Sequence, residues 1–218
     1  FAQIDDIRVH PMYVETSAPE WDKPTHAYDY TMIFEEISAK MTIKTIGIAN
    51  PNIIPYKIME DIKKAAPDAK YVDAERQLME LRWYKSENEL KILREAYRIT
   101  EEGVKQVCDM IEPGVREWEI EAKWRSIVYQ MGAEGTGYPV WVTSGPSTYQ
   151  SLCKSTDRII QNNEMVQLSL GAKYNGYCGN LCRAIVLGEI PQKHMDMINV
   201  TYECLEDTAD IMKPGVSF

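Results

Sequence analysis

Residues 166–185 read Val-Gln-Leu-Ser-Leu-Gly-Ala-Lys-Tyr-Asn-Gly-Tyr-Cys-Gly-Asn-Leu-Cys-Arg-Ala-Ile, with a run of β-forming residues on each side of Asn175-Gly176. This dipeptide favours a type I′ hairpin turn, because both turn residues need a positive φ. Tyr174 then pairs with Tyr177 across the turn. Because side chains alternate between the two faces of a strand, the hairpin is predicted to place four residues on one face: Ser169, Gly171, Asn180 and Cys182.

This hairpin resembles the central hairpin of the creatinase, prolidase and methionine aminopeptidase family, the M24-type proteins with the pita-bread fold. Further segments match the family in the same order along the chain: Lys85–Glu89, Ile111–Gly114, Gly132–Gly135, Ser144–Pro146 and Thr156–Arg158. The resemblance implies an α+β fold in which helices pack on a curved, mostly antiparallel sheet. It also implies a homodimer.

Two domains are expected. Residues 1–83 are predicted to form part of a small N-terminal α/β domain of the creatinase and prolidase type. In it, a strand at 44–49, a helix at 56–66 and a strand at 70–72 form a strand–helix–strand unit, which favours parallel pairing. Another helix is predicted within 25–41, with Asp29 near its start, and residues 1–24 are assigned no element.

Residues 84–218 are predicted to form the first half of a pita-bread domain. Ser86 and Glu89 form a capping box, and the helix that follows is predicted to end at Pro113-Gly114. Its expected core stripe is Leu93, Tyr97, Val104, Val107, Cys108 and Ile111. Later elements are expected as a helix ending at Gly132, a strand at 140–143, a turn at 144–146 and a helix at 192–212. Because residues 111–115 and 212–216 are similar, a second copy of the unit is expected to begin where the chain stops, which indicates a fragment.

The departures from the family concern its metal site. In metal-dependent relatives, aspartates that bind two metal ions stand at the positions of Ser169 and Asn180, and a histidine stands at the position of Leu152. Divalent ions need negatively charged oxygen donors or nitrogen donors, and these three residues supply neither a charge nor an imidazole. We therefore expect no bound metal and no cofactor.

The catalytic residues of creatinase are not present at the matching positions of this chain either. Creatinase works without metal, but its acid/base histidine matches Leu152 and its hairpin glutamate matches Cys182. Cys182 could be a nucleophile, yet Arg183 faces the opposite side of the strand, so the thiol is better explained as a packing residue. No catalytic residue is assigned. The expected pocket-lining residues are Leu152, Ser169, Gly171, Asn180 and Cys182.

Composition narrows the possible partners. The net charge is −9 without a basic cluster, which argues against nucleic acid. No apolar run approaches the roughly 20 residues of a membrane span. Five cysteines without a CxxC pair indicate reduced thiols, and hence a cytoplasmic protein.

Three hypotheses for function follow. The first is a metal-independent hydrolase of a small C–N substrate, an amide or an amidine. The second is an inactive pita-bread module that binds a peptide or a protein. The third, which the residues favour least, is a metal-dependent Xaa-Pro peptidase with substituted ligands.

Overall fold

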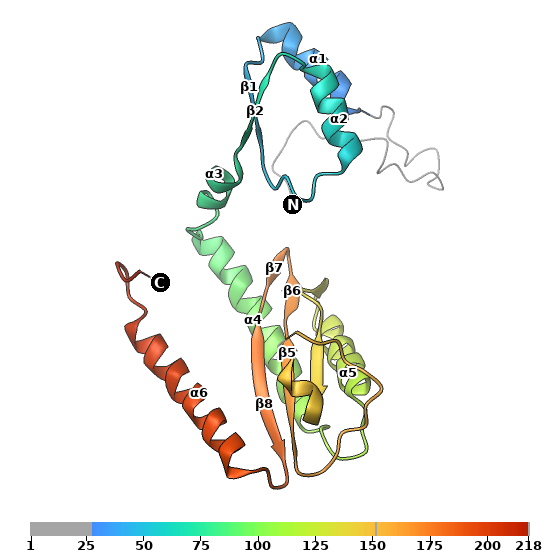
Figure 1. Ribbon diagram of the computed structural model, residues 1–218, viewed down its shortest axis with the longest axis vertical. Helices are drawn as coiled ribbons and strands as arrows, with labels where there is room; N and C mark the ends of the chain where they lie inside the picture. Colours follow the sequence, from blue (N-terminus) through green and yellow to red (C-terminus); the bar gives the residue numbers. More distant parts are fainter. Residues whose placement is uncertain (1–27, 151, 218) are drawn as a thin grey trace. The chain divides into compact units, whose positions relative to one another are not determined.

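A computed structural model describes residues 28–150 and 152–217 of the chain (Figure 1). The chain divides into two compact units between Tyr84 and Lys85, and each unit is described by itself. The segment 1–24 lies outside the described residues. No helix in the described part of the chain is long and apolar enough to cross a membrane.

The first unit contains the predicted strand–helix–strand arrangement. Strands β1 (Thr45–Ile48) and β2 (Lys70–Asp73) pair in parallel, and α2 (Tyr56–Ala65) connects them. The preceding helix, α1 (Tyr30–Lys40), starts where Asp29 accepts a hydrogen bond from the Met32 amide at 2.9 Å, which is the N-cap role that favours Asp at this position.

Helix α3 (Glu75–Glu80) was not expected from the sequence. It begins directly after β2, where the Asp73 carboxylate accepts a hydrogen bond from the Glu75 amide at 2.8 Å. Arg76 and Glu80 add an ion pair of 2.9 Å one turn apart. The helix is short and has no buried residue, so it lacks the apolar periodicity on which a sequence prediction depends.

The second unit opens with α4 (Glu87–Cys108), and its predicted capping box is confirmed: Glu89 accepts from the Ser86 amide at 2.6 Å. The predicted end of this helix is wrong, because α4 stops well before Pro113-Gly114. The segment after it turns away to pair with the connection before β5, and the Gly114 amide donates to the Ile160 carbonyl at 2.9 Å. The similar residues 111–115 and 212–216 nevertheless form the same turn, in which the Val115 amide donates to the Glu112 carbonyl at 3.3 Å and the Val216 amide to the Lys213 carbonyl at 3.1 Å.

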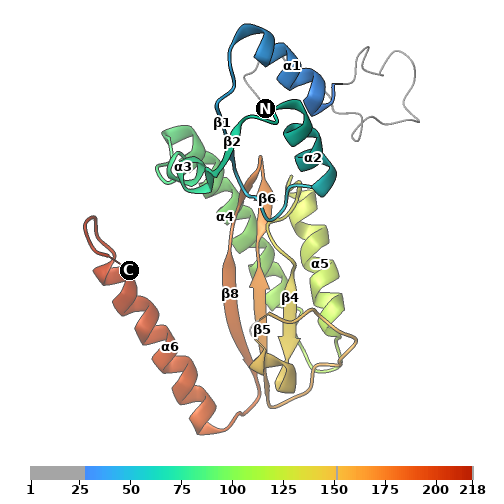
Figure 2. The same cartoon turned by 45° about the horizontal axis from the view of Figure 1, so that its top comes forward.

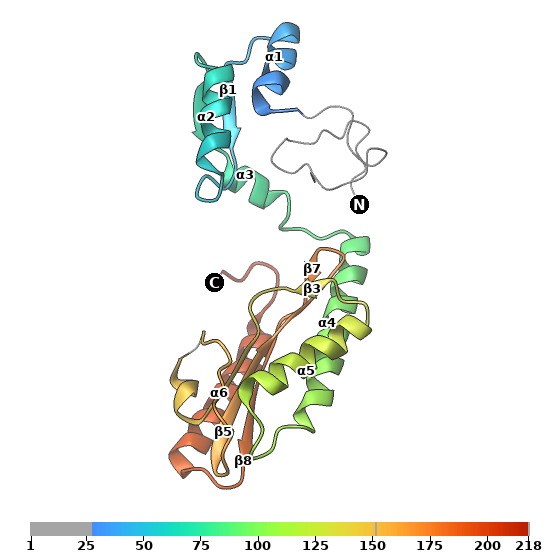
Figure 3. The same ribbon diagram turned by 90° about the vertical axis from the view of Figure 1, so that its right-hand side faces the viewer.

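The main sheet is antiparallel and has the strand order β4-β5-β8, with bounds Trp141–Ser144, Glu164–Leu170 and Leu181–Leu187. Helices α4 and α5 (Glu117–Gln130) cover the same face of this sheet (Figure 3). The core between them is apolar and includes Ile99, Val104, Ile120, Trp124, Val142, Val166, Leu168 and Leu170. Tyr97 was predicted to join this core, but it is 47% exposed.

The hairpin keeps its predicted turn and register but is interrupted. Asn175 and Gly176 have φ of 46° and 81°, and Ser169 lies opposite Cys182. Its distal part belongs to a second sheet, whose strands are β3 (Gly135–Thr136), β6 (Ala172–Tyr174) and β7 (Tyr177–Cys178), in the order β3-β6-β7. The face of the main sheet and the hairpin above it are seen in Figure 2.

Two glycines, Gly171 and Gly179, lie at the interruption. A Cβ at Gly171 would collide with the Gly179 carbonyl and lie 2.7 Å from the Tyr138 ring, and a Cβ at Gly179 would lie 2.7 Å from the Ala96 carbonyl on α4. The two glycines allow the backbones to approach this closely. Strand pairing changes from one sheet to the other at this point.

Two further elements complete the unit. The predicted turn at 144–146 is instead the start of a 3-10 helix, η3 (Gly145–Tyr149). The predicted last helix is confirmed as α6 (Gln192–Ile211), of which no residue is buried.

Candidate functional site

One row of side chains crosses the main sheet on the face turned away from α4 and α5. In the strand register, Trp141 on β4 lies opposite Ser169 on β5, which lies opposite Cys182 on β8. Directly paired residues project from the same face of a sheet. The neighbours of Ser169 in the chain, Leu168 and Leu170, are apolar and point into the core on the other face.

Tyr138, in the loop between β3 and β4, joins three of the predicted site residues. Its hydroxyl donates to Asn180 Oδ1 at 2.7 Å and lies 3.4 Å from Ser169 Oγ. Its ring lies against Gly171, where a side chain would displace it. Cys182 Sγ is 3.2 Å from Ser169 Oγ. The structure therefore brings together Ser169, Gly171, Asn180 and Cys182, with Tyr138 at their centre.

The Tyr138 hydroxyl hydrogen goes to Asn180, so a hydrogen bond across the 3.4 Å contact with Ser169 uses the Ser169 hydrogen. In the 3.2 Å contact between Ser169 Oγ and Cys182 Sγ, either atom can be the donor. Burial raises the pKa of the Tyr138 phenol above its ordinary value, and the phenol therefore stays protonated and keeps its role as donor.

Burial differs along this cluster. Ser169 is buried and forms its floor, whereas Asn180 and Cys182 are exposed at its rim. Trp141 is half-buried, and its ring centroid lies 5.1 Å from that of Tyr138. The cluster thus combines one buried hydroxyl, two exposed polar side chains and two neighbouring aromatic rings.

Two residues lie outside the cluster. Leu152 is 69% exposed on the segment between η3 and β5. Arg183 lies on the opposite face of β8, where it lines a groove of about 430 Å³ along α4. The guanidinium is therefore on the wrong side of the sheet to act on the Cys182 thiol, as the strand alternation predicted.

A buried carboxylate fixes both ends of the Leu152 segment. Glu117 at the start of α5 is fully buried, and its Oε1 accepts from the amide and the hydroxyl of Ser144, both at 2.7 Å. Its Oε2 accepts from the amide and the hydroxyl of Thr156, at 2.9 and 2.7 Å. Glu117 therefore joins the strand end before the segment to the turn after it.

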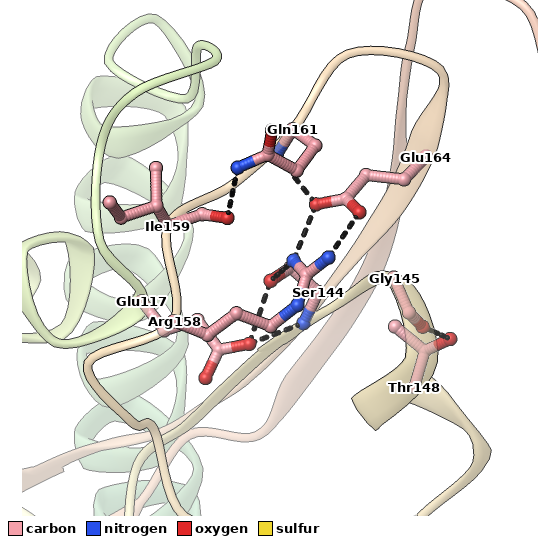
Figure 4. A network of polar contacts seen from close by, with 8 residues as sticks. All are labelled: Glu117, Ser144, Gly145, Thr148, Arg158, Ile159, Gln161 and Glu164. Atoms are coloured by element: carbon pink, nitrogen blue, oxygen red, sulfur yellow. Dashed lines mark hydrogen bonds and ion pairs between the residues drawn. The ribbon is translucent and has the colours of Figure 1, made fainter.

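Arg158 extends this network (Figure 4). Its guanidinium donates to Ser144 Oγ at 2.5 Å and makes two hydrogen bonds of 2.6 Å with Glu164. Burial raises the pKa of the Glu164 carboxyl, but the hydrogen bonds from Arg158 and from the Gln161 amide outweigh it, so this pKa lies below its ordinary value. The sequence pattern indicated the Thr156–Arg158 turn but not its partners.

The donor set does not fit a divalent metal pair. Ser169 and Asn180 offer neutral oxygens, and both are already bonded to the Tyr138 hydroxyl, which stands between them. Hard divalent ions need charged oxygen ligands, and a phenol that remains protonated supplies no charge. Among the described residues, no group of three or more His, Cys, Asp or Glu side chains is arranged to hold a metal ion.

Comparison with known proteins agrees with this architecture. The chain is 27% identical over 175 residues to an Xaa-Pro dipeptidase from Pyrococcus horikoshii, covering 80% of this chain and 49% of that protein. It is similar to the crystal structure of the prolidase from Pyrococcus horikoshii, with a TM-score of 0.79 and 26% identity, over 90% of this chain and 55% of that one.

The crystal structure of an X-Pro aminopeptidase from Thermotoga maritima shares the fold, with a TM-score of 0.73 and 23% identity, over 85% of this chain and 52% of that one. The chain spans about half the length of the curated relatives that it matches. The α+β architecture is therefore that of the pita-bread proteins. The model of metallopeptidase family M24 matches residues 91–218, more than half of the chain, and the chain belongs to that family.

Proposed function

We propose that this M24 protein hydrolyses a small C–N compound, an amide or an amidine, without metal ions at the hairpin positions. The observation that carries the proposal is the Tyr138 hydroxyl, bonded to Asn180 at 2.7 Å and 3.4 Å from Ser169. A neutral hydrogen-bond network takes the place in which metal-dependent relatives are expected to hold cations. Changing two carboxylates into neutral groups removes most of the attraction for a divalent ion.

In such a reaction, water adds across the C–N bond, the carbon keeps the oxygen and the amine leaves with a proton. The residues of this cluster would bind and orient the substrate, because Tyr138 remains protonated and Ser169 donates its only hydrogen within the network. The acid and base of the reaction are assigned to no residue described here.

A second candidate function is a binding module without catalysis. It is favoured by the composition of the cluster: none of Tyr138, Ser169, Asn180 and Cys182 is a carboxylate or an imidazole that could act as a general base near neutral pH. This module would bind a small molecule, a peptide or a protein on the same face.

The decisive experiment combines metal analysis with a hydrolysis assay on the dialysed protein. We expect well under one equivalent of Mn, Co, Zn or Fe, and release of amine from a panel of small amides and amidines that EDTA does not inhibit. Two equivalents of metal together with hydrolysis of Gly-Pro that EDTA abolishes would overturn the proposal in favour of an Xaa-Pro peptidase. Binding without any amine release would favour the module.

A further inference from the structure

The orientation of the Asn180 side chain selects a class of ligand. Its Oδ1 accepts the hydrogen of the Tyr138 hydroxyl at 2.7 Å. The amide is planar, so its amino group is directed away from this bond and bears two donor hydrogens. Within residues 28–150 and 152–217 no hydrogen-bond partner is found for this amino group, and Asn180 is exposed at the rim of the cluster.

The other polar groups of the cluster contact one another. Tyr138 donates to Asn180, and Ser169 Oγ lies 3.4 Å from the Tyr138 oxygen and 3.2 Å from Cys182 Sγ. The Asn180 amino group is the amide donor of the cluster that is directed away from these contacts and can serve a ligand. A carboxylate at this position would present two acceptors and attract a cation, whereas the amide presents donors and attracts an acceptor.

The two aromatic rings beside the cluster suit a flat group. Trp141 is half-buried beside Ser169, with its ring 5.1 Å from the Tyr138 ring. A planar acyl group could lie against one of these rings while its oxygen accepts from Asn180. No charged side chain takes part in the hydrogen bonds of the cluster, so nothing in it offsets the charge of a buried ion.

We propose that the cluster binds the carbonyl oxygen of a neutral amide through Asn180 Nδ2, with Tyr138 as the positioning residue that holds the Asn180 amide in this orientation. The inference rests on the proposed function in using the same site. It deepens that function by choosing the amide over the amidine, because an amidinium has donors and no acceptor oxygen.

Acetamide and acetamidinium are nearly isosteric and test this choice directly. We would titrate each into the ¹⁵N-labelled protein and follow the side-chain amide signals of Asn180, assigned by their loss in Asn180→Asp, and the indole signal of Trp141. Acetamide should shift both sets of signals at least tenfold more strongly, at equal concentration, than acetamidinium does.

Asn180→Asp keeps the acceptor for Tyr138 but replaces the amino group with a charged oxygen. The variant should lose acetamide binding and gain acetamidinium binding, as followed on the Trp141 signal. Asn162→Asp, on the exposed turn before β5, makes the same change of charge elsewhere and should leave the preference unchanged. Tyr138→Phe keeps the ring but frees the Asn180 amide, and its affinity for acetamide should fall severalfold while its circular dichroism spectrum is retained.

Tighter binding of acetamidinium to the unaltered protein, or an Asn180→Asp variant that binds acetamide as well as the parent does, would overturn the inference. The proposed function fails separately. If the protein selects acetamide but releases amine from no substrate, only the proposed hydrolysis is contradicted. If it hydrolyses amidines but not amides, only the choice of ligand is contradicted.

Discussion

Glu117 is a single carboxylate on which the geometry of the segment around Leu152 depends. It is fully buried and accepts four hydrogen bonds, two from Ser144 and two from Thr156. Buried charges are retained in proteins where such bonds replace their hydration. Because the donors belong to both ends of the segment, a change in Glu117 acts on the loop as well as on stability.

Glu117→Gln tests this role. The amide nitrogen would face two donors from either Ser144 or Thr156, and we expect the free energy of unfolding to fall by about 3 kcal/mol, as measured by urea denaturation. The matched control is Glu101→Gln, which removes an exposed ion pair of 3.1 Å with Lys105 and should cost less than about 1 kcal/mol. Equal effects of the two substitutions would contradict a structural role for Glu117.

Glu89 links the capping box of α4 to the hairpin. Its carboxylate accepts from the Tyr177 hydroxyl at 2.7 Å and from the Ser86 amide at 2.6 Å. The hydrogen bond from Tyr177, followed by those from Ser86, lowers the pKa of Glu89 from 4.5 to about 2. A carboxyl whose pKa is lower in the folded state stabilises the fold above the pKa of the unfolded state.

The resulting pH dependence has a definite sign. The stabilising effect of Glu89 should be complete above pH 4.5 and should be lost as the pH falls from there toward 2. Urea unfolding at several pH values should show the difference between the parent and Glu89→Gln shrinking across this window. A difference that stays constant down to the lower end would mean that the two hydrogen bonds do not shift this pKa.

At the scale of elements, the hairpin depends on backbone conformation at its turn. Gly176 has a φ of 81°, and a Cβ built there would contact nothing within 4 Å. The cost of a side chain at this position is therefore conformational and not steric. Gly135 in β3 also has open space around it but an ordinary φ, which makes it a suitable control.

Gly176→Ala should destabilise the protein by about 1–2 kcal/mol, the cost of placing an L-residue in the left-handed region. Gly135→Ala should change the stability by less than about 0.5 kcal/mol. Both values can be measured from urea denaturation midpoints at constant slope. If Gly135→Ala proved to be the more harmful change, the turn would not be the determinant of the hairpin register.

At the scale of the whole molecule, the two units divide between Tyr84 and Lys85, and residues 81–88 around this division are all exposed. Aromatic and leucine side chains occur here, with Leu81 at 77%, Trp83 at 57% and Tyr84 at 88% exposure. Exposed connections without buried backbone are preferred sites of proteolysis.

Brief digestion with chymotrypsin should therefore cut first after Leu81, Trp83 or Tyr84 and release a resistant fragment that begins near Lys85 and contains the Tyr138 cluster. Mass spectrometry identifies the cut, and a Leu81→Gly, Trp83→Gly, Tyr84→Gly variant should slow it. Early cleavage within α4 or the β4-β5-β8 sheet would contradict the division into two units.

Local patterns in the sequence determined much of this architecture. The Asn175-Gly176 turn and strand alternation were sufficient to place Ser169 opposite Cys182, and Ser86 with Glu89 was sufficient to start α4. Such signals involve residues a few positions apart, so they act before any tertiary contact forms. The pita-bread fold was implied by the resemblance of the motifs around them to those of the creatinase and prolidase family.

The tertiary structure alone decided how the site is assembled. Tyr138 meets Ser169 and Asn180 across 31 and 42 positions of sequence, and Glu117 meets Thr156 across 39. The end of α4 was likewise decided by the pairing of Gly114 with Ile160. Periodicity and turn chemistry carry no information about such partners, because hydrogen bonds between distant segments form only once packing has brought the segments together.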